Sequence, residues 1–224
     1  MPAGDTGVRQ RIFLVDDHPL VREWLSELLE QQPELEVCGE AAGGPEALKA
    51  IQDSCPDLAV VDLTLKEGSG LELIKDLQSL CPGVAVLVLS MHEEAHYAER
   101  ALRAGARGYV VKRDTARKVI HAIQEVLAGG TFVSESVATA LAARLATGRK
   151  RITGQPAEIL SDRELEVFEL LGQGRGTRQI SDSLCVSLKT VQAYCARIKE
   201  KLGLGSATEL LREAVRWQEQ QTGV

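Results

Sequence analysis

Apolar residues follow two alternating patterns through the first half of the chain. From Ile12 to about Ala128, short apolar runs alternate with longer stretches in which apolar residues recur every three or four positions. This rhythm predicts a parallel sheet with crossover helices on both faces. The predicted strands are Ile12–Val15, Leu35–Cys38, Leu58–Val61, Ala85–Leu89 and Gly108–Val111. The predicted helices begin near Pro19, Pro45, Leu71, Glu94 and Thr115. We therefore expect an α/β fold with a five-stranded, doubly wound parallel sheet.

The pattern changes after Gly129 and Gly130. An Ala-rich stretch at Ser136–Leu145 predicts a helix, and the Gly, Pro and basic residues of Thr147–Pro156 predict a linker. From Ser161 onward the pattern is helical throughout, and both Ser161–Glu164 and Ser206–Glu209 have the form of a capping box at a helix start. We expect a second, smaller all-α domain of four short helices.

A helix-turn-helix pattern lies within this second domain. Residues 178–184 and 188–202 have helical patterns, and the short turn between them ends at Ser187, a plausible N-cap. One face of the second helix is apolar and is expected to be buried; its residues are Leu188, Val191, Cys195, Ile198 and Leu202. The opposite face carries small, amide, hydroxyl and cationic side chains, which suits a helix that lies in the major groove of DNA.

Composition and charge narrow the function classes. The 224 residues are 44% hydrophobic and contain no apolar run of about 18 residues, so we expect a cytoplasmic protein with no membrane contact. A net charge of −6 argues against a protein that coats nucleic acid along its whole surface. Between Arg175 and Lys201, however, the net charge is +4. Five cysteines without a C-x-x-C pair indicate reduced thiols.

Polar residues end the predicted strands of the first domain. Asp16 and Asp17 follow the first strand and Asp62 the third, while Ser90 ends the fourth and Lys112 follows the fifth. Ligands bind outside the carboxyl ends of such strands, so these side chains are expected to converge. Three carboxylates in one crevice repel one another unless a cation such as Mg²⁺ lies among them. Asp62 can then attack phosphorus, while Lys112 and Ser90 stabilise the phosphoryl oxygens.

These residues belong to longer motifs. Val15-Asp-Asp-His-Pro19, Asp62-Leu-Thr-Leu-Lys-Glu-Gly-Ser-Gly70, Leu89-Ser-Met91 and Gly108-Tyr-Val-Val-Lys112 resemble those of receiver domains, which have a flavodoxin-like fold. The resemblance implies that Asp62 is the phosphoacceptor. It also implies that Asp17 binds Mg²⁺ directly, that Asp16 does so through water, and that the Thr64 carbonyl is a further ligand. Ser90 and Tyr109 take the switch positions. Lys66 departs from the family, since many receivers carry proline there.

The second domain resembles the LuxR-type helix-turn-helix that ends NarL/FixJ regulators. The resemblance rests on Leu160–Phe168, Gly172–Gly174, Ile180-Ser181, Lys189–Val191 and Lys201–Gly203. It implies that Gln192, Ala193 and Ala196 face bases. It implies phosphate contacts from Lys189, Thr190, Tyr194, Arg197 and Lys199. Since Ala196 has no hydrogen-bonding group, DNA shape and phosphate contacts are expected to carry more of the specificity.

Together, the motifs predict a two-component response regulator, not an enzyme. We expect a receiver at 11–128, a helix and linker at 129–157, and a DNA-binding domain at 158–217. A sensor histidine kinase would phosphorylate Asp62, and an active homodimer would bind double-stranded DNA.

Two alternatives stay open. The first is a constitutive DNA-binding regulator whose receiver serves only for dimerisation. The second is a phosphohydrolase of the haloacid-dehalogenase type, although such enzymes place an acid/base aspartate where this chain has Thr64.

His18, which follows the two acids, is interpreted as a solvated or capping residue.

Overall fold

Two compact units make up the structure, a computed structural model that describes residues 9–65, 67–91, 95–146, 156–184 and 186–222. The units are Met1–Gly148 and Arg149–Val224. Lys66, Cys185 and residues 147–155 of the predicted linker lie outside the described residues. Each unit has its own buried core.

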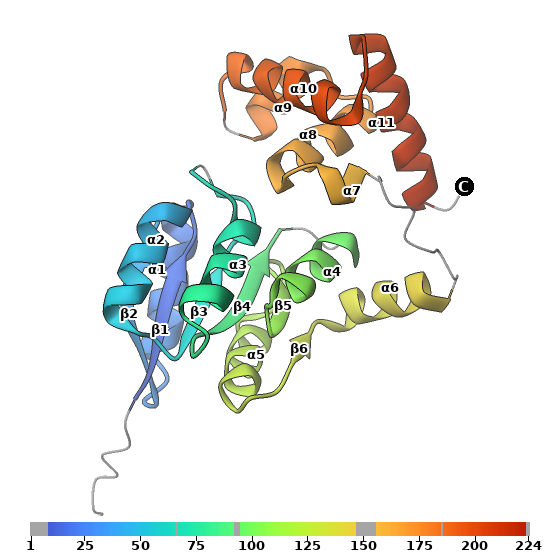
Figure 1. Ribbon diagram of the computed structural model, residues 1–224. Helices are drawn as coiled ribbons and strands as arrows, with labels where there is room; N and C mark the ends of the chain where they lie inside the picture. The colour runs from blue at the N-terminus through green and yellow to red at the C-terminus, as the bar shows by residue number, and fades with distance from the viewer. Residues whose placement is uncertain (1–8, 66, 92–94, 147–155, 185, 223–224) are drawn as a thin grey trace, which may run out of the picture. The chain divides into compact units, whose positions relative to one another are not determined.

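A parallel sheet of six strands forms the centre of the first unit (Figure 1). Its strand order is β2-β1-β3-β4-β5-β6, and every neighbouring pair is parallel. The strands are β1 (Gln10–Val15), β2 (Leu35–Ala41), β3 (Leu58–Val61), β4 (Ala85–Ser90), β5 (Gly108–Val111) and β6 (Phe132–Val133). The predicted doubly wound α/β class is confirmed, but the predicted number of five strands was one too few.

The sixth strand has only two residues, and that length explains why the sequence pattern did not predict it. Alternation of apolar and polar residues needs about four positions before it indicates a strand. Phe132 and Val133 are placed after a turn in which Gly129 has φ of 86°, and they pair with Gly108 and Tyr109 of β5. Tertiary pairing, not local pattern, makes this strand.

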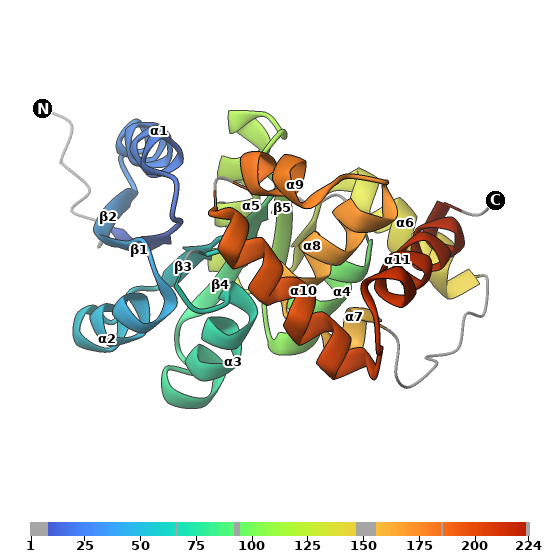
Figure 2. The same ribbon diagram turned by 90° about the horizontal axis from the view of Figure 1, so that it is seen from above.

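Helices cover both faces of the sheet. They are α1 (Pro19–Glu30), α2 (Gly44–Ser54), α3 (Gly70–Leu80), α4 (Ala95–Ala104) and α5 (Ala116–Leu127), and each begins within one residue of its predicted start. Apolar side chains of α1 and α5, including Leu25, Leu29 and Ile123, share one core with Ile12 and Leu14 of β1. In Figure 2, α2 and α3 lie on the opposite side of the sheet from α1.

A further helix, α6 (Glu135–Ala146), also packs in the first unit, where it contacts α4. Ser134, which precedes this helix, is buried. Its backbone N and its Oγ donate to the Tyr109 carbonyl oxygen at 3.1 and 3.5 Å. The start of α6 is therefore tied directly to β5.

The second unit is all-helical. It contains α7 (Pro156–Ile159), α8 (Asp162–Gly172), α9 (Thr177–Ser183), α10 (Leu188–Leu202) and α11 (Ala207–Thr222). The four predicted helices are thus present, together with the single turn α7. Their core contains Phe168, Ile180, Val191, Ile198 and Trp217, all of them buried.

Helix caps in this unit follow the predicted motifs with one difference. Ser161 Oγ accepts from the Glu164 backbone N at 3.4 Å, and Glu164 Oε2 accepts from the Ser161 N at 2.8 Å, which completes a capping box. Ser206 Oγ likewise accepts from the Glu209 N at 3.1 Å. The Glu209 carboxylate, however, accepts from the Gly205 N instead of the Ser206 N.

The described residues bear on two further expectations, reduced thiols and the absence of a membrane span. Cys38, Cys55, Cys81 and Cys195 are free cysteines. No helix in the described part of the chain is long and apolar enough to cross a bilayer.

Gly70, the first residue of α3, has little room for a side chain. A Cβ there would lie 2.1 Å from the Asp62 carbonyl oxygen and 2.7 Å from the Leu63 Cα. Because both neighbours are backbone atoms, Gly70→Ala is expected to lower the free energy of unfolding by about 1–3 kcal/mol. Gly83→Ala is the matched control, since no atom lies within 4 Å of a Cβ at that position. Urea unfolding followed by circular dichroism would measure the difference, and equal midpoints for the two variants would contradict this account.

Candidate functional site

The carboxyl ends of β1 and β3 bring three aspartates to one edge of the sheet. Asp16 and Asp17 directly follow β1, and Asp62 directly follows the neighbouring strand β3. The strand order reverses between these two strands, and open α/β sheets form their ligand crevices at such a point. The backbone N of Asp62 donates to the Val15 carbonyl at 2.8 Å, which keeps the two strand ends level.

All three carboxylates are nearly inaccessible to solvent. The relative exposures of Asp16, Asp17 and Asp62 are 2%, 4% and 3%. One ligand atom from each, together with a ring nitrogen of His18, lies within 4.8 Å of the others. Oxygen donors with several negative charges are the set that a hard divalent cation prefers, so the donor chemistry fits Mg²⁺.

Lys112 supplies the protein's own positive charge to this cluster. It follows β5, its side chain is only 7% exposed, and its Nζ lies 2.7 Å from Asp62 Oδ2 and 2.6 Å from Asp16 Oδ2. The backbone N of Lys112 donates to the Ser90 carbonyl at 2.7 Å, which fixes the end of β5 beside the end of β4. The ammonium group therefore bridges two carboxylates from different strands.

The pKa values of Asp62 and Lys112 reflect the balance between burial and the neighbouring charges. Burial raises the pKa of Asp62 to about 6, with Asp16 adding to the rise and Lys112 opposing it. Burial alone would lower the pKa of Lys112, but the two carboxylates outweigh that effect and raise it. At neutral pH Lys112 is thus a cation, and Asp62 ionises close to the physiological range.

The other predicted receiver residues lie near the cluster or in the sheet beneath it. The Thr64 backbone N donates to Asp62 Oδ1 at 3.3 Å. Ser90 ends β4, and Tyr109 lies on β5 opposite Val88; both are fully buried. The roles of Thr64, Ser90 and Tyr109 stay predictions.

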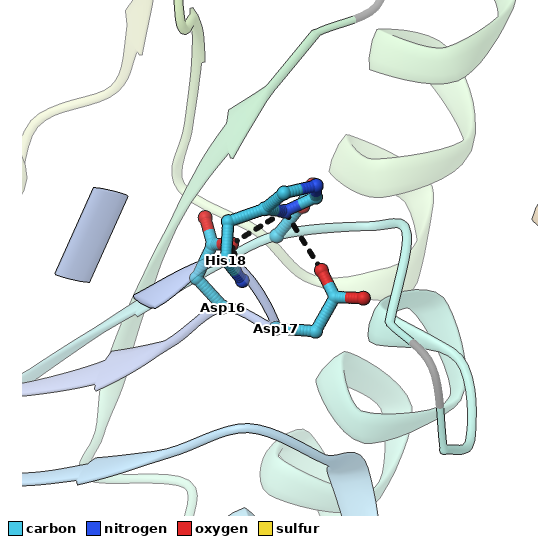
Figure 3. Close-up of side chains that lie close together, drawn as sticks. Asp16, Asp17 and His18 are labelled. Carbon is cyan, nitrogen blue, oxygen red and sulfur yellow. Dashed lines mark hydrogen bonds and ion pairs between the residues drawn. The ribbon is translucent and has the colours of Figure 1, made fainter. Parts of the chain in front are cut away.

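His18 is exposed, as expected of a solvated residue, but its ring also meets the two acids, which the sequence did not predict. Its ring Nδ1 lies 2.8 Å from Asp17 Oδ1 and 3.1 Å from Asp16 Oδ1 (Figure 3). The residue is the N-cap of α1, but its side chain makes no capping hydrogen bond. The sequence signal for this position was Pro19. A residue before proline is restricted to extended backbone, and with this backbone the His18 ring lies against the two acids.

The predicted helix-turn-helix consists of α9, a short turn and α10. Ser181 Oγ donates to the Val186 carbonyl at 2.6 Å, which ties the turn to α9. Ser187 Oγ accepts from the Thr190 backbone N at 3.1 Å, so the predicted N-cap of α10 is present. Ile180 and Val191 are buried on the two sides of the turn and hold the helices together.

One face of α10 is buried, although not over its full predicted length. Val191 and Ile198 are buried and Cys195 and Leu202 are half-buried, but Leu188 is 43% exposed. The expectation that Leu188 belongs to the core was wrong. This residue is the first of α10, one turn before Val191, where the buried face of the helix begins.

The predicted DNA-contacting residues share the other side of α10. Those that are exposed are Lys189, Gln192, Ala196 and Arg197, and those that are half-buried are Thr190, Ala193, Tyr194 and Lys199. The Arg197 guanidinium lies 5.5 Å from the centre of the Tyr194 ring, within the range of a cation–π contact. Their individual contacts with DNA stay predictions.

Lys201, which contributed to the basic cluster in the sequence, has an internal role. Its Nζ lies 2.6 Å from Glu164 Oε2, and the Glu164 side chain is only 3% exposed. Burial raises the pKa of Glu164, but hydrogen bonds from Lys201 and Ser161 outweigh it and lower the pKa overall. The sequence does not distinguish such a lysine from one that faces DNA, because its partner lies 37 positions away.

Two families match the chain. The family described as "Response regulator receiver domain" matches residues 12–124, and the family described as "Bacterial regulatory proteins, luxR family" matches residues 158–214. The oxygen regulatory protein NreC of Staphylococcus carnosus is 35% identical over 210 residues, which cover 92% of this chain and 97% of that protein. NreC of Staphylococcus aureus matches to the same extent.

Solved structures of similar proteins agree with these matches. A two-component response regulator of the LuxR family from Aurantimonas sp. has a TM-score of 0.60 and 36% identity, covering 62% of this chain and 99% of that chain. RcsB from Salmonella enterica serovar Typhimurium, bound to the promoter P1flhDC in the presence of the phosphomimetic BeF3−, has a TM-score of 0.58 and 26% identity. That match covers 92% of this chain and 99% of that chain.

The raised pKa of Asp62 has a consequence for stability. A carboxyl whose pKa rises from 3.8 to about 6 on folding stabilises the fold below its ordinary pKa, and this contribution is lost as the pH rises through 6. Asp62→Asn is therefore expected to raise the free energy of unfolding by about 1–3 kcal/mol at pH 7.5, while Lys112 keeps its contact with Asp16. The gain should shrink toward pH 4.

Calorimetric unfolding of both proteins between pH 4 and pH 8 would measure this difference. Asp53→Asn is the control, because Asp53 is exposed on α2. A variant no more stable than the wild type at pH 7.5 would show that the ionised Asp62 carries no net cost.

Proposed function

The chain belongs to the two-component response regulators that join a receiver domain to a LuxR-type DNA-binding domain, and from this membership we propose that phosphorylation of Asp62 by a sensor histidine kinase controls its binding to DNA. We take residues 11–128 as the receiver, 129–157 as a helix and linker, and 158–217 as the DNA-binding domain. A DNA-binding function supports a cytoplasmic location.

The bridging position of Lys112 is the observation that carries the proposal. Asp62 presents a carboxylate oxygen that can attack phosphorus, and its pKa of about 6 leaves that oxygen ionised at neutral pH. The leaving group departs with its bond electrons as the acyl phosphate forms. Lys112 lies 2.7 Å from Asp62 and can neutralise the charge on the incoming phosphoryl oxygens.

Asp16, Asp17, Asp62 and the Thr64 carbonyl would hold Mg²⁺ beside this nucleophile. When bound, the ion supplies positive charge against the carboxylates and the phosphoryl oxygens. By the resemblance to receiver domains, Asp62 and Asp17 would be direct ligands, whereas Asp16 would act through water.

Ser90 and Tyr109 would convert phosphorylation into a conformational change. Ser90 would follow the phosphoryl group, and Tyr109 would respond by changing its rotamer. The Tyr109 carbonyl accepts hydrogen bonds from Ser134 at the start of α6, so a shift of β5 has a short path to the segment that leads into the second unit. Such a change would shift an existing equilibrium between two states.

The exposed side of α10 would lie in the major groove of DNA. Gln192, Ala193 and Ala196 would face bases, and cationic and hydroxyl side chains would contact phosphates; these are Lys189, Thr190, Tyr194, Arg197 and Lys199. In one solved structure of the similar protein RcsB, two RcsB dimers are bound to two parallel DNAs. By analogy, we propose that the active form of this chain is a homodimer on double-stranded DNA.

The family matches favour this regulator over a constitutive one whose receiver serves only for dimerisation. They also favour it over a phosphohydrolase. Thr64 stands where a hydrolase of that type needs a second aspartate, and a hydroxyl is too weak an acid to protonate a leaving group efficiently.

Phosphate-affinity electrophoresis after incubation with Mg²⁺ and acetyl phosphate tests the proposed switch. The wild type should shift, and Asp62→Ala should not, because it lacks the attacking oxygen. Asp53→Ala is the matched control, since it removes an exposed aspartate from the same unit. If neither the wild type nor the control shifts, the receiver is not a phosphoacceptor under these conditions and the constitutive alternative gains support.

A second experiment tests the DNA contacts. Lys189→Ala should weaken binding to duplex DNA uniformly across sequences and reduce the slope of log affinity against log salt by about 1, as expected for the loss of one phosphate contact. Lys49→Ala, which removes an exposed lysine from α2, should change neither quantity. Fluorescence anisotropy with labelled DNA at several salt concentrations measures both; an unchanged slope for Lys189→Ala would place that residue away from the phosphates.

A further inference from the structure

An imidazole nitrogen lies among the carboxylates of the acidic cluster, and Mg²⁺ chemistry does not account for it. His18 Nδ1 lies 2.8 Å from Asp17 Oδ1 and 3.1 Å from Asp16 Oδ1 (Figure 3). Mg²⁺ binds oxygen and gains little from imidazole, whereas Fe²⁺, Co²⁺, Ni²⁺ and Zn²⁺ bind imidazole well. The ring therefore adds a ligand type that discriminates among divalent ions.

We propose that His18 Nδ1 joins Asp16, Asp17 and Asp62 in a mixed nitrogen–oxygen site that binds a first-row transition-metal ion such as Co²⁺ more tightly than Mg²⁺. The inference rests on the proposed function, because it concerns the same carboxylates that would hold Mg²⁺. It adds a protein ligand and a different class of ion.

The spacing of the ligand atoms agrees with coordination of one ion. Neighbouring ligands about 2.1 Å from an octahedral ion lie about 3 Å from each other, and opposite ligands lie about 4.2 Å apart. The two distances from His18 Nδ1 to the carboxylate oxygens, 2.8 and 3.1 Å, match neighbouring ligands. The full set of four atoms lies within 4.8 Å, close to the separation of opposite ligands on one ion.

Local backbone structure directs the ring toward the acids. His18 precedes Pro19, which begins α1, and its backbone is extended with φ of −97° and ψ of 107°. The His18 backbone N donates to Asp16 Oδ1 at 2.8 Å, which closes a tight turn between the two residues. Although His18 holds the N-cap position, its side chain does not cap α1. Its orientation thus serves the acidic cluster instead of the helix.

Ligation requires that Nδ1 gives up its proton. In the present geometry Nδ1 faces ionised carboxylate oxygens, which can only accept, so the two contacts require a proton on Nδ1. To bind a metal ion, Nδ1 must present its lone pair while Nε2 carries the proton. The His18 side chain is 57% exposed, so water can carry the proton from one nitrogen to the other.

Calorimetric titration of the full chain with Co²⁺ and with Mg²⁺ tests the proposal, together with the visible absorption spectrum of bound Co²⁺. The wild type should bind Co²⁺ at least about tenfold more tightly than Mg²⁺. His18→Ala should lose at least about tenfold in Co²⁺ affinity, shift the Co²⁺ spectrum, and keep its Mg²⁺ affinity within about twofold. The retained Mg²⁺ affinity also shows that the variant is folded.

Two control variants separate the loss of the His18 ligand from the loss of any other histidine or of a shared carboxylate. His121→Ala removes an exposed histidine of α5 and should change neither affinity nor spectrum. Asp17→Asn should weaken both ions. The proposal is overturned if His18→Ala leaves Co²⁺ affinity and spectrum unchanged, or if it weakens Mg²⁺ as much as Co²⁺. If the His18→Ala result overturns the proposal but the wild type binds Mg²⁺ and is phosphorylated on Asp62, the proposed function still stands. If the wild type binds neither Co²⁺ nor Mg²⁺, both this inference and the proposed function are contradicted.

Discussion

Three carboxylates buried at one edge of a sheet repel one another, and the first unit is organised around the neutralisation of that charge. Lys112 meets part of the requirement by placing one ammonium group between Asp16 and Asp62. This contact joins residues that follow β1, β3 and β5, so it depends on the parallel pairing that aligns their ends. The apolar residues of the strands and the covering helices form a rigid frame, and the polar residues at its edge depend on that frame for their geometry.

The two units use buried carboxylates in opposite ways. Glu164 accepts hydrogen bonds from the Ser161 backbone and from Lys201, and these donors lower its pKa despite burial. Asp62 shares the ammonium group of Lys112 with Asp16, and burial raises the pKa of Asp62. A carboxylate with donors of its own stabilises a fold when it ionises, whereas a buried one that shares its partner costs free energy when it ionises. The same residue chemistry thus has opposite effects on stability in the two units.

Periodicity and motif spacing were sufficient for the main elements, because long amphipathic helices and buried strands have strong local signals. The strand-end residues Asp16, Asp62 and Lys112 could be placed together because parallel strands share one carboxyl edge. The features that were missed depend on contacts between distant segments. The strand β6 exists only through its pairing with β5, and Lys201 is neutralised by a glutamate on another helix. The direction of the His18 ring is a local exception, because Pro19 restricts the backbone of His18 but does not fix its side chain.

The short strand β6 also affects how the sheet can meet other chains. It lies outside β5 and covers part of an edge whose unpaired N–H and C=O groups would otherwise be able to bind a strand of another molecule. With only two residues, β6 itself offers a poor template for strand addition. Growth of the sheet from this side is therefore disfavoured, which protects the unit from edge-to-edge aggregation. Any contact with another molecule at this edge would then depend on side chains rather than on backbone pairing.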